Sequence, residues 1–261
     1  MLELSPSAKA TIYIGIPGAI AFVVIGLILS FRRGRLHPLL LVCISAMSIS
    51  WIEAPYDWAV YAQFPPALPR MPSWWPLNWT WGGGVPECVP VGYMFYMCFP
   101  ALISVALARW FNSKFQWRAP ITLLTVGLIT GTLWAFIFNG IIGAQLGMFH
   151  YGRVIEGLAL WPGTIHQYPL YDSLAMGVQM MVFAYVLGRV DSLGRTFVDA
   201  WADSQAKSRL GSSFLSIVGV IVIGNVVYLS VFAPHLVTKV LHMQTIAPNE
   251  QLYPGVPNQP L

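Results

Sequence analysis

Three carboxyl groups at the ends of long apolar segments are the side chains in this sequence best suited to chemistry. Glu53 and Asp57 stand near the end of one segment, and Asp172 stands at the start of another. Ionisable groups at the edge of an apolar core are costly, so they usually face an interior or a wet cavity. Carboxyl groups that are buried, or that lie beside another acid, can donate protons near neutral pH. These three residues are therefore the predicted catalytic set for acid–base chemistry.

A structural role for the same acids stays open. Glu53 and Asp57 are four residues apart and would share a helical face, but Pro55 between them predicts a kink or a helix end. The two acids could then cap that end, or pair with Arg70 or Arg153. Asp172 falls in the first turn of a predicted helix, where the helix dipole favours a carboxylate.

Further polar and aromatic residues are candidates for binding a substrate beside the acids. Tyr93 and Tyr96 precede a predicted kink at Pro100, and Gln179 lies two helical turns below Asp172. The alternative for such buried groups is a hydrogen bond that joins two helices. The predicted binding residues are Trp74, Trp75, Glu87, Tyr93, Tyr96, Asn139, His150, Arg153, Glu156 and Gln179.

No metal or cofactor is expected. The histidines include no HxxxH or HxH pair, and His150 and His166 are too far apart in sequence to suggest a site by themselves. The three cysteines, Cys43, Cys88 and Cys98, have no CxxC spacing. A serine-centred elbow, a phosphate-binding glycine loop and a nicotinamide fingerprint are also missing from the sequence.

Composition places these residues in a membrane protein. Of the 261 residues, 56% are hydrophobic and 9% are charged, against roughly 25% charged in soluble domains. Apolar stretches long enough to cross a hydrocarbon core of about 30 Å can be read directly. They cover residues 11–31, 38–57, 90–109, 120–142, 169–188 and 213–233. We expect an all-α, polytopic bundle of about six transmembrane helices that forms a single domain over residues 1–261.

The distribution of basic residues predicts the orientation. Ten of the 14 lie in the connections before the second, fourth and sixth spans. They are Arg32, Arg33, Arg35, Arg109, Lys114, Arg118, Arg189, Arg195, Lys207 and Arg209. By the positive-inside rule those connections are cytoplasmic, so both termini are expected outside the cell membrane.

Two long connections, 58–89 and 143–168, lie on the predicted outer side. The first is rich in Trp and Pro, as in Trp74-Trp75-Pro76, and the second holds a run of aromatic and glycine residues. Long loops without structure of their own are uncommon unless they bind something, and tryptophan suits the headgroup level of a membrane. We expect the two connections to pack together as a lid.

The same features limit the partners. Short basic clusters between apolar segments form no face that could follow a phosphate backbone, so no nucleic acid is expected. Membrane lipids and a lipophilic small-molecule substrate are the expected partners. A homo-oligomer or a partner in a membrane complex stays open.

Five short sequence elements, spread over most of the chain, together resemble a known family. They are Glu53-Ala54-Pro55-Tyr56-Asp57, Trp74-Trp75-Pro76, Val85-Pro86-Glu87 with Gly92-Tyr93, Gly147-Met148-Phe149-His150-Tyr151, and Gln167-Tyr168-Pro169-Leu170-Tyr171-Asp172. In order and spacing they resemble the avermectin spirocyclase (AveC-like) family of actinobacterial integral membrane proteins. The family pattern has an acid and an arginine near the outer end of the fourth span, where this chain has Asn139 and Gln145.

The resemblance implies a cofactor-independent cyclase that closes dihydroxy-ketone chains into spiroketals, with an additional dehydration in the named member. The residues fit a lipophilic polyketide-, terpenoid- or steroid-like substrate, with Glu53 and Asp172 facing each other across a cavity below the lid. One alternative is an intramembrane terpene cyclase, in which a carboxyl group opens an epoxide or protonates an alkene. Another is a non-catalytic lipid-binding or assembly subunit of an envelope membrane complex.

Overall fold

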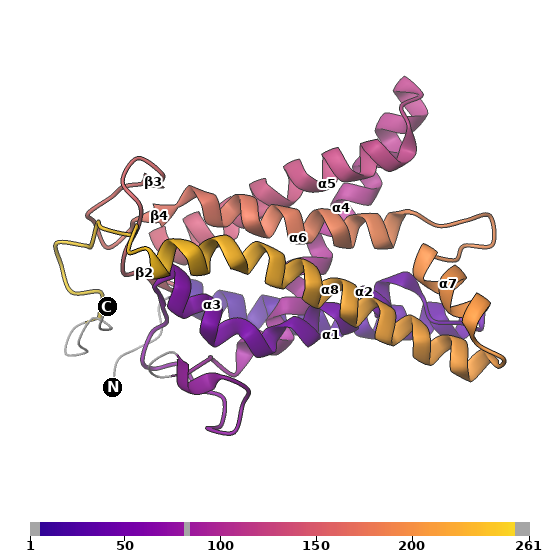
Figure 1. Ribbon diagram of the computed structural model, residues 1–261, viewed down its shortest axis with the longest axis horizontal. Helices are drawn as coiled ribbons and strands as arrows, with labels where there is room; N and C mark the ends of the chain where they lie inside the picture. The colour runs from indigo at the N-terminus through magenta and orange to yellow at the C-terminus, as the bar shows by residue number, and fades with distance from the viewer. Residues whose placement is uncertain (1–5, 81–83, 254–261) are drawn as a thin grey trace.

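Six helical spans form the bundle, and two of them are interrupted by helix of a different pitch. The computed structural model describes residues 6–80 and 84–253. The first span is α1 (Pro6–Arg33), and the second consists of α2 (Pro38–Ser48), η1 (Ile49–Ile52) and α3 (Glu53–Val60). The third is α4 (Cys88–Phe115), and the fourth consists of α5 (Ala119–Ala135) and η3 (Phe136–Gln145). The last two are α6 (Leu170–Gly188) and α8 (Arg209–Val240). All six are long and apolar enough to cross a membrane (Figure 1). The predicted all-α membrane bundle is confirmed.

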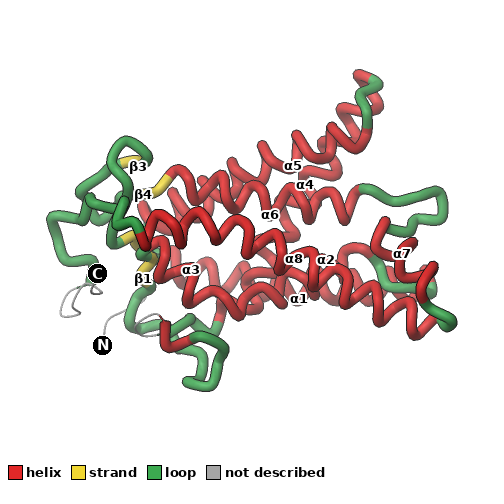
Figure 2. Tube along the Cα trace, in the orientation of Figure 1, coloured by secondary structure: helices red, strands yellow, loops and turns green. Residues whose placement is uncertain are grey.

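The loops at one end of the bundle form a cap, made of residues 61–80, 84–87, 146–169 and 241–253 (Figure 2). Within it, β1 (Ala62–Gln63) pairs antiparallel with β2 (His150–Tyr151), which confirms that the two long connections pack together as a lid. A second pair joins β3 (Ala159–Leu160) to β4 (Tyr168–Pro169). A short 3₁₀ helix, η2 (Asn78–Thr80), lies in the Trp/Pro-rich loop.

The segment after α8 is a third part of the cap, and the sequence did not predict it. Val154 and Ile246 form an antiparallel bridge. The Tyr253 hydroxyl donates a hydrogen bond to the carbonyl oxygen of Gln63 at 2.9 Å. Both described ends of the chain lie at the cap end of the bundle (Figure 1).

The opposite end of the bundle gathers the ten basic residues that the orientation rule used. It also carries a short helix, α7 (Phe197–Gln205), which begins at a capping box between Thr196 and Asp199. Arg35 pairs with Asp203 at 2.9 Å, so this end is held partly by charge. The sequence therefore predicted correctly which loops lie together at each end of the bundle. The side of the membrane that each end faces stays a prediction.

Small residues let α5 and α6 approach closely. A Cβ atom on Gly177 would lie 2.1 Å from Thr132 Oγ1, and one on Gly131 would lie 2.8 Å from Met180 Cβ. Such contacts are typical of helix association in membranes, where close packing replaces the hydrophobic effect. The close approach sets the start of α6, with Asp172, beside η3, which continues α5.

The helix continues through Pro55, which corrects the helix end predicted there. The 3₁₀ turn η1 ends at Ile52, and α3 begins at Glu53. Pro55 is therefore in the first turn of a new helix, where its missing N–H costs no hydrogen bond. Glu53 and Asp57 consequently lie one turn apart on the same face of α3.

Candidate active site

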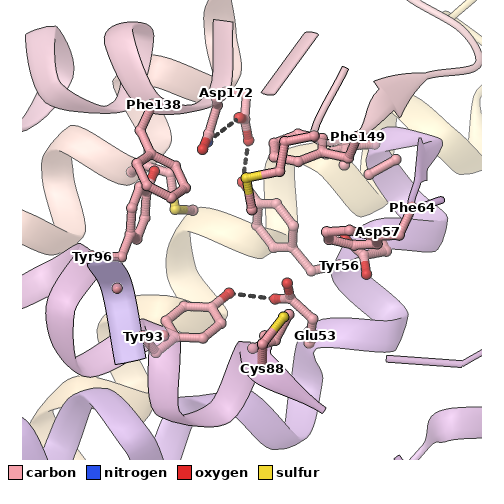
Figure 3. Close-up of a pocket in the computed structure, with 18 of the residues that line it drawn as sticks. Glu53, Tyr56, Asp57, Phe64, Cys88, Tyr93, Tyr96, Phe138, Phe149 and Asp172 are labelled. Atoms are coloured by element: carbon pink, nitrogen blue, oxygen red, sulfur yellow. Dashed lines mark hydrogen bonds between the residues drawn. The ribbon is translucent and has the colours of Figure 1, made fainter. Parts of the chain in front are cut away.

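A cavity lies where the bundle meets the cap (Figure 3). The empty space between its walls is about 820 Å³ when the solvent at its open mouth is included. Most of its wall is apolar or aromatic, formed by residues that include Val60, Phe64, Phe95, Phe138, Met148, Phe149 and Met176. The predicted catalytic acids Glu53, Asp57 and Asp172 all line it. The fold therefore brings two distant parts of the sequence to one cavity.

Glu53 is held by tyrosine hydroxyls from two other spans. It projects from the start of α3 and is only 7% exposed. The Tyr93 hydroxyl donates to Glu53 Oε2, and Tyr228 also bonds to Tyr93 and lies 3.5 Å from the same oxygen. In Figure 3 the carboxyl group points into the cavity beside Cys88. A carboxyl group fixed on one oxygen keeps the other available to a ligand.

Asp172 stands across the cavity from Glu53, in the first turn of α6, and is 1% exposed (Figure 3). Three uncharged donors bond to it. The Tyr56 hydroxyl reaches Oδ1 at 2.7 Å, while the Tyr151 hydroxyl and Asn139 Nδ2 reach Oδ2 at 2.9 and 3.0 Å. All three donors are uncharged, so they orient the carboxyl group without placing a counter-charge beside it.

The donors of Asp172 come from three different parts of the chain. Burial, reinforced by the charge of Asp172, raises the pKa of Tyr151 well above its ordinary value. The Tyr151 hydroxyl therefore stays protonated and can donate its hydrogen bond. Asn139 lies in η3, a π-helical segment whose wider turns are frequent at functional sites. Strand β2 presents Tyr151, and α3 presents Tyr56, from the turn between Glu53 and Asp57.

Tyr56 links Asp172 to a histidine that lies outside the cavity wall. His235 Nε2 is 3.0 Å from the Tyr56 hydroxyl, and the two rings pack edge to face at 5.1 Å. The other ring nitrogen, Nδ1, is buried without a hydrogen-bond partner among the described residues. His235 therefore orients Tyr56, and through it the carboxyl group of Asp172.

Asp57 lines the cavity and has one buried oxygen without a hydrogen-bond partner among the described residues. The residue is 4% exposed, and its Oδ2 atom has no hydrogen-bond partner in the described part of the chain. Arg70 does not neutralise it by direct contact, because this guanidinium donates to the carbonyl oxygens of Phe64, Pro65 and Gly84. Buried polar atoms normally have partners, so Asp57 is an exception in the wall of the cavity.

Only some of the predicted binding residues reach the cavity. Tyr93, Tyr96 and Asn139 line it. Trp74 is 75% exposed, and Trp75 packs instead against the small cluster of Ala54 and Val85. The binding roles predicted for the two tryptophans thus have no contact with the cavity to support them.

The remaining candidates lie in the cap or deeper in the bundle. Glu87 and Glu156 are exposed, and Arg153 is half-buried within the cap. His150 is buried in β2, beside the rings of His166 and Tyr253.

Gln179 lies in the bundle interior, away from the cavity wall. Its Nε2 atom donates to the carbonyl oxygen of Gly224 at 3.3 Å. This bond joins α6 to α8, which matches the structural alternative for a buried amide. Its binding role stays a prediction.

Sequence reasoning found Tyr93 and Asn139 but missed the other side chains that hold the acids or orient those that do. Tyr56, Tyr151, Tyr228 and His235 come from three separate regions of the chain. Tyr228 and His235 are seven residues apart, so they share a face of the last span, and that spacing was an available signal. Nothing in the sequence connects that face to Glu53 or Asp172.

The fold and cavity define a class: a multi-pass membrane protein with a carboxyl-lined cavity under a cap of loops. The model of the AveC-like spirocyclase family matches residues 31–259, which is most of the chain. The protein therefore belongs to the AveC-like spirocyclase family, as the sequence resemblance predicted. Comparison with curated proteins and with solved structures gives no match.

Proposed function

We propose that this protein is a membrane-embedded, cofactor-independent cyclase that closes lipophilic hydroxy-ketone chains into spiroketals. The observation that carries the proposal is the placement of Glu53 and Asp172 in one apolar cavity, each held by tyrosine hydroxyls. Family membership suggests chemistry of the spirocyclase type. Carboxyl groups can carry out this reaction without a cofactor, because it needs only proton transfer and stabilisation of a cation.

Glu53 is the proposed acid. One hydroxyl of the substrate first adds to the ketone and gives a hemiketal. Glu53 then donates its proton to the hemiketal hydroxyl, the carbon–oxygen bond breaks, and water leaves. The ring oxygen shares a lone pair with the carbon, which gives an oxocarbenium ion. The second hydroxyl attacks that carbon and returns its proton to the Glu53 carboxylate, so the balance is spiroketal plus one water.

Asp172 is the proposed stabiliser of the cation. Its two oxygens accept three hydrogen bonds from uncharged groups, so the carboxylate is fixed in position before the reaction begins. A charge that is already oriented toward the developing cation needs no reorganisation during the reaction. Asp57, which also lines the cavity, is the proposed acceptor for a substrate hydroxyl.

The apolar wall supports a substrate that is mostly hydrocarbon. Aromatic side chains such as Phe138 and Phe149 pack against the carbon chain and restrict water, which would otherwise capture the cation. A polyketide-like chain with a ketone and two hydroxyls meets both the apolar wall and the three acids. We also propose that the cap faces the outside of the cell membrane, in keeping with the charge distribution.

The test is turnover by purified protein in lipid nanodiscs. The protein is incubated with synthetic long-chain dihydroxy-ketones, and the products are separated by liquid chromatography with mass detection. The expected product is lighter by one water and is enriched in one stereoisomer, because the cavity fixes the face of attack. Glu53→Gln is expected to abolish turnover without loss of folded protein, since the amide keeps the shape but has no acidic proton.

Glu250→Gln is the matched control, because Glu250 is exposed in the cap and lies outside the cavity wall. It should turn over at the parent rate. Equal activity of the parent and Glu53→Gln would remove Glu53 as the acid. Conversion of polyenes or epoxides, but of no hydroxy-ketone, would favour the terpene cyclase alternative.

A further inference from the structure

Two glycines in the cavity wall have no packing reason to be glycine. Gly15 in α1 and Gly92 in α4 both line the cavity, and a Cβ atom on either would meet nothing within 4 Å. Among the described glycines inside helices, only these two have such free space. Gly18, one turn below Gly15, is the contrast: its Cβ would lie 2.5 Å from the Phe95 ring.

Glycine has a cost in the interior of a helix. It is less favourable than alanine by roughly 0.5–1 kcal/mol, because it loses more backbone freedom on folding. At Gly18 the close contact between α1 and α4 offsets that cost. The same contact includes the ring of Phe22, which stacks on Phe95 with their centroids 6.0 Å apart. At Gly15 and Gly92 nothing packs closely enough to do so. What these positions gain is empty volume on the cavity side.

The free space lies between two helices, at a depth that lipid reaches. The span in α1 begins at Ile12 and α4 begins at Cys88, so each glycine is about one turn inside its span. Ile14, beside Gly15, is 63% exposed, as expected for a side chain that faces lipid. The α1 contribution to the cavity wall is only Gly15 and Ile16.

The outer turn of α1 is also weakened. Pro17 lies inside the helix and has no N–H to bond the carbonyl oxygen of Tyr13. With Gly15 and Gly18 on either side, this turn is the part of α1 that can bend at the lowest cost. Below it, the tight contact at Gly18 keeps α1 attached to α4.

We propose that the gap between Gly15 and Gly92 is a lateral port, in which the apolar tail of an amphipathic ligand lies. The ligand enters from the bilayer between α1 and α4, with its oxygenated head toward Glu53 and Asp172 and its tail toward lipid. The identity of this ligand as the substrate rests on the proposed function. The port itself is a binding and entry site, and its existence can be tested without any turnover.

Cys88 provides a natural reporter of entry. It lines the cavity beside Glu53 (Figure 3), one turn from Gly92. Cys43 and Cys98 are buried in the core, with their sulfur atoms 3.6 Å apart. Protein in liposomes is reacted with N-(1-pyrenyl)maleimide, which partitions into the bilayer, and separately with a sulfonated, water-soluble maleimide. Loss of labelling in Cys88→Ala identifies the site of reaction.

The pyrenyl reagent should label Cys88 faster than the sulfonated one. Gly15→Trp is expected to slow the pyrenyl reaction on the order of tenfold, equal to about 1.4 kcal/mol of added barrier. Gly92→Leu should act in the same direction. Ile14→Trp is the matched control, because it adds the same bulk one residue away but toward lipid, and it should leave the rate unchanged.

A graded series keeps the test decisive if the large substitutions unfold the protein. Gly15→Ala and Gly92→Ala fit the helix, so they should leave thermal unfolding unchanged or raise its midpoint. At each position the pyrenyl reaction should be fastest with Gly, slower with Ala and slowest with Leu. Unchanged labelling across the series, or faster labelling by the sulfonated reagent, would overturn the port. If labelling slows as expected but no hydroxy-ketone is turned over, the result counts against the proposed function alone.

Discussion

Asp172→Asn separates a catalytic role for this residue from a structural one. The amide oxygen can occupy the place of Oδ2 and keep the hydrogen bonds from Asn139 and Tyr151. The amide nitrogen then lies near the Tyr56 hydroxyl, which can accept from it and donate to His235 Nε2. No buried group loses its partner. The expected loss is roughly 1–2 kcal/mol of unfolding free energy, since bonds to a charged acceptor become bonds to a neutral one.

Asp172→Ala provides the structural reference. It leaves the Tyr151 hydroxyl and the Asn139 amide without an acceptor, whereas Tyr56 can donate to His235. At roughly 1–3 kcal/mol for each buried donor, the free energy of unfolding should fall by at least about 2 kcal/mol. Turnover behaves differently, because both variants lose the negative charge. We expect Asp172→Asn to lose at least about 100-fold in turnover, the range seen when one stabilising group of a transition state is removed.

The assay combines turnover of a dihydroxy-ketone in nanodiscs with thermal unfolding of the same samples. Rates are divided by the fraction of folded protein at the assay temperature. Parent-level turnover by Asp172→Asn would refute the role of Asp172 in stabilising a cation. Activity that follows the folded fraction in both variants would show that the acid is structural.

Two further predictions concern the cap. In intact cells carrying a Cys-free background, an impermeant thiol reagent should label a cysteine at Ser73 but not one at Lys114, because the basic loops are expected inside; the reverse pattern would invert the topology. Burial, with a smaller effect of the nearby His166, lowers the pKa of His150 below 6.5. The unfolded chain then binds more protons, so the contribution of His150 to stability is complete above that pH and is lost as the pH falls below it. Thermal unfolding at about pH 5.5 and 7.5, on either side of the ordinary histidine value, should differ less in His150→Gln than in the parent, and an equal difference would exclude this residue.

The sequence predicted the parts of the molecule that depend on segment length and local composition. Six apolar stretches required six spans, because a helix that crosses a lipid core needs about 20 apolar residues. The ends of those stretches placed Glu53 and Asp172 near one boundary of the membrane. Loop composition correctly predicted a cap from two of its three segments, since Trp and Pro in a long connection indicate packing rather than disorder.

Local signals were ambiguous where two principles competed. Pro55 predicted a kink or helix end, but the 3₁₀ turn before it allows a new helix to start at Glu53, so the proline falls where no N–H is needed. Trp74 and Trp75 were expected at the substrate because they are aromatic and lie in the lid. Aromatic character alone does not distinguish a residue that faces a cavity from one that faces lipid headgroups.

Only the tertiary structure decided which groups hold the acids and where the cavity opens. Asp172 is hydrogen-bonded to Tyr56, Tyr151 and Asn139, which are separated from it by 116, 21 and 33 positions in the sequence. Hydrogen bonds across such separations leave no trace in local periodicity. The same is true of Gly15 and Gly92, which look like any other helical glycines until their neighbours are known. Composition and spacing determine that a segment enters the membrane and at what depth each residue lies. The rotation of each helix about its axis depends on close contacts with the others, and that rotation is what turns scattered acids, tyrosines and glycines into one site.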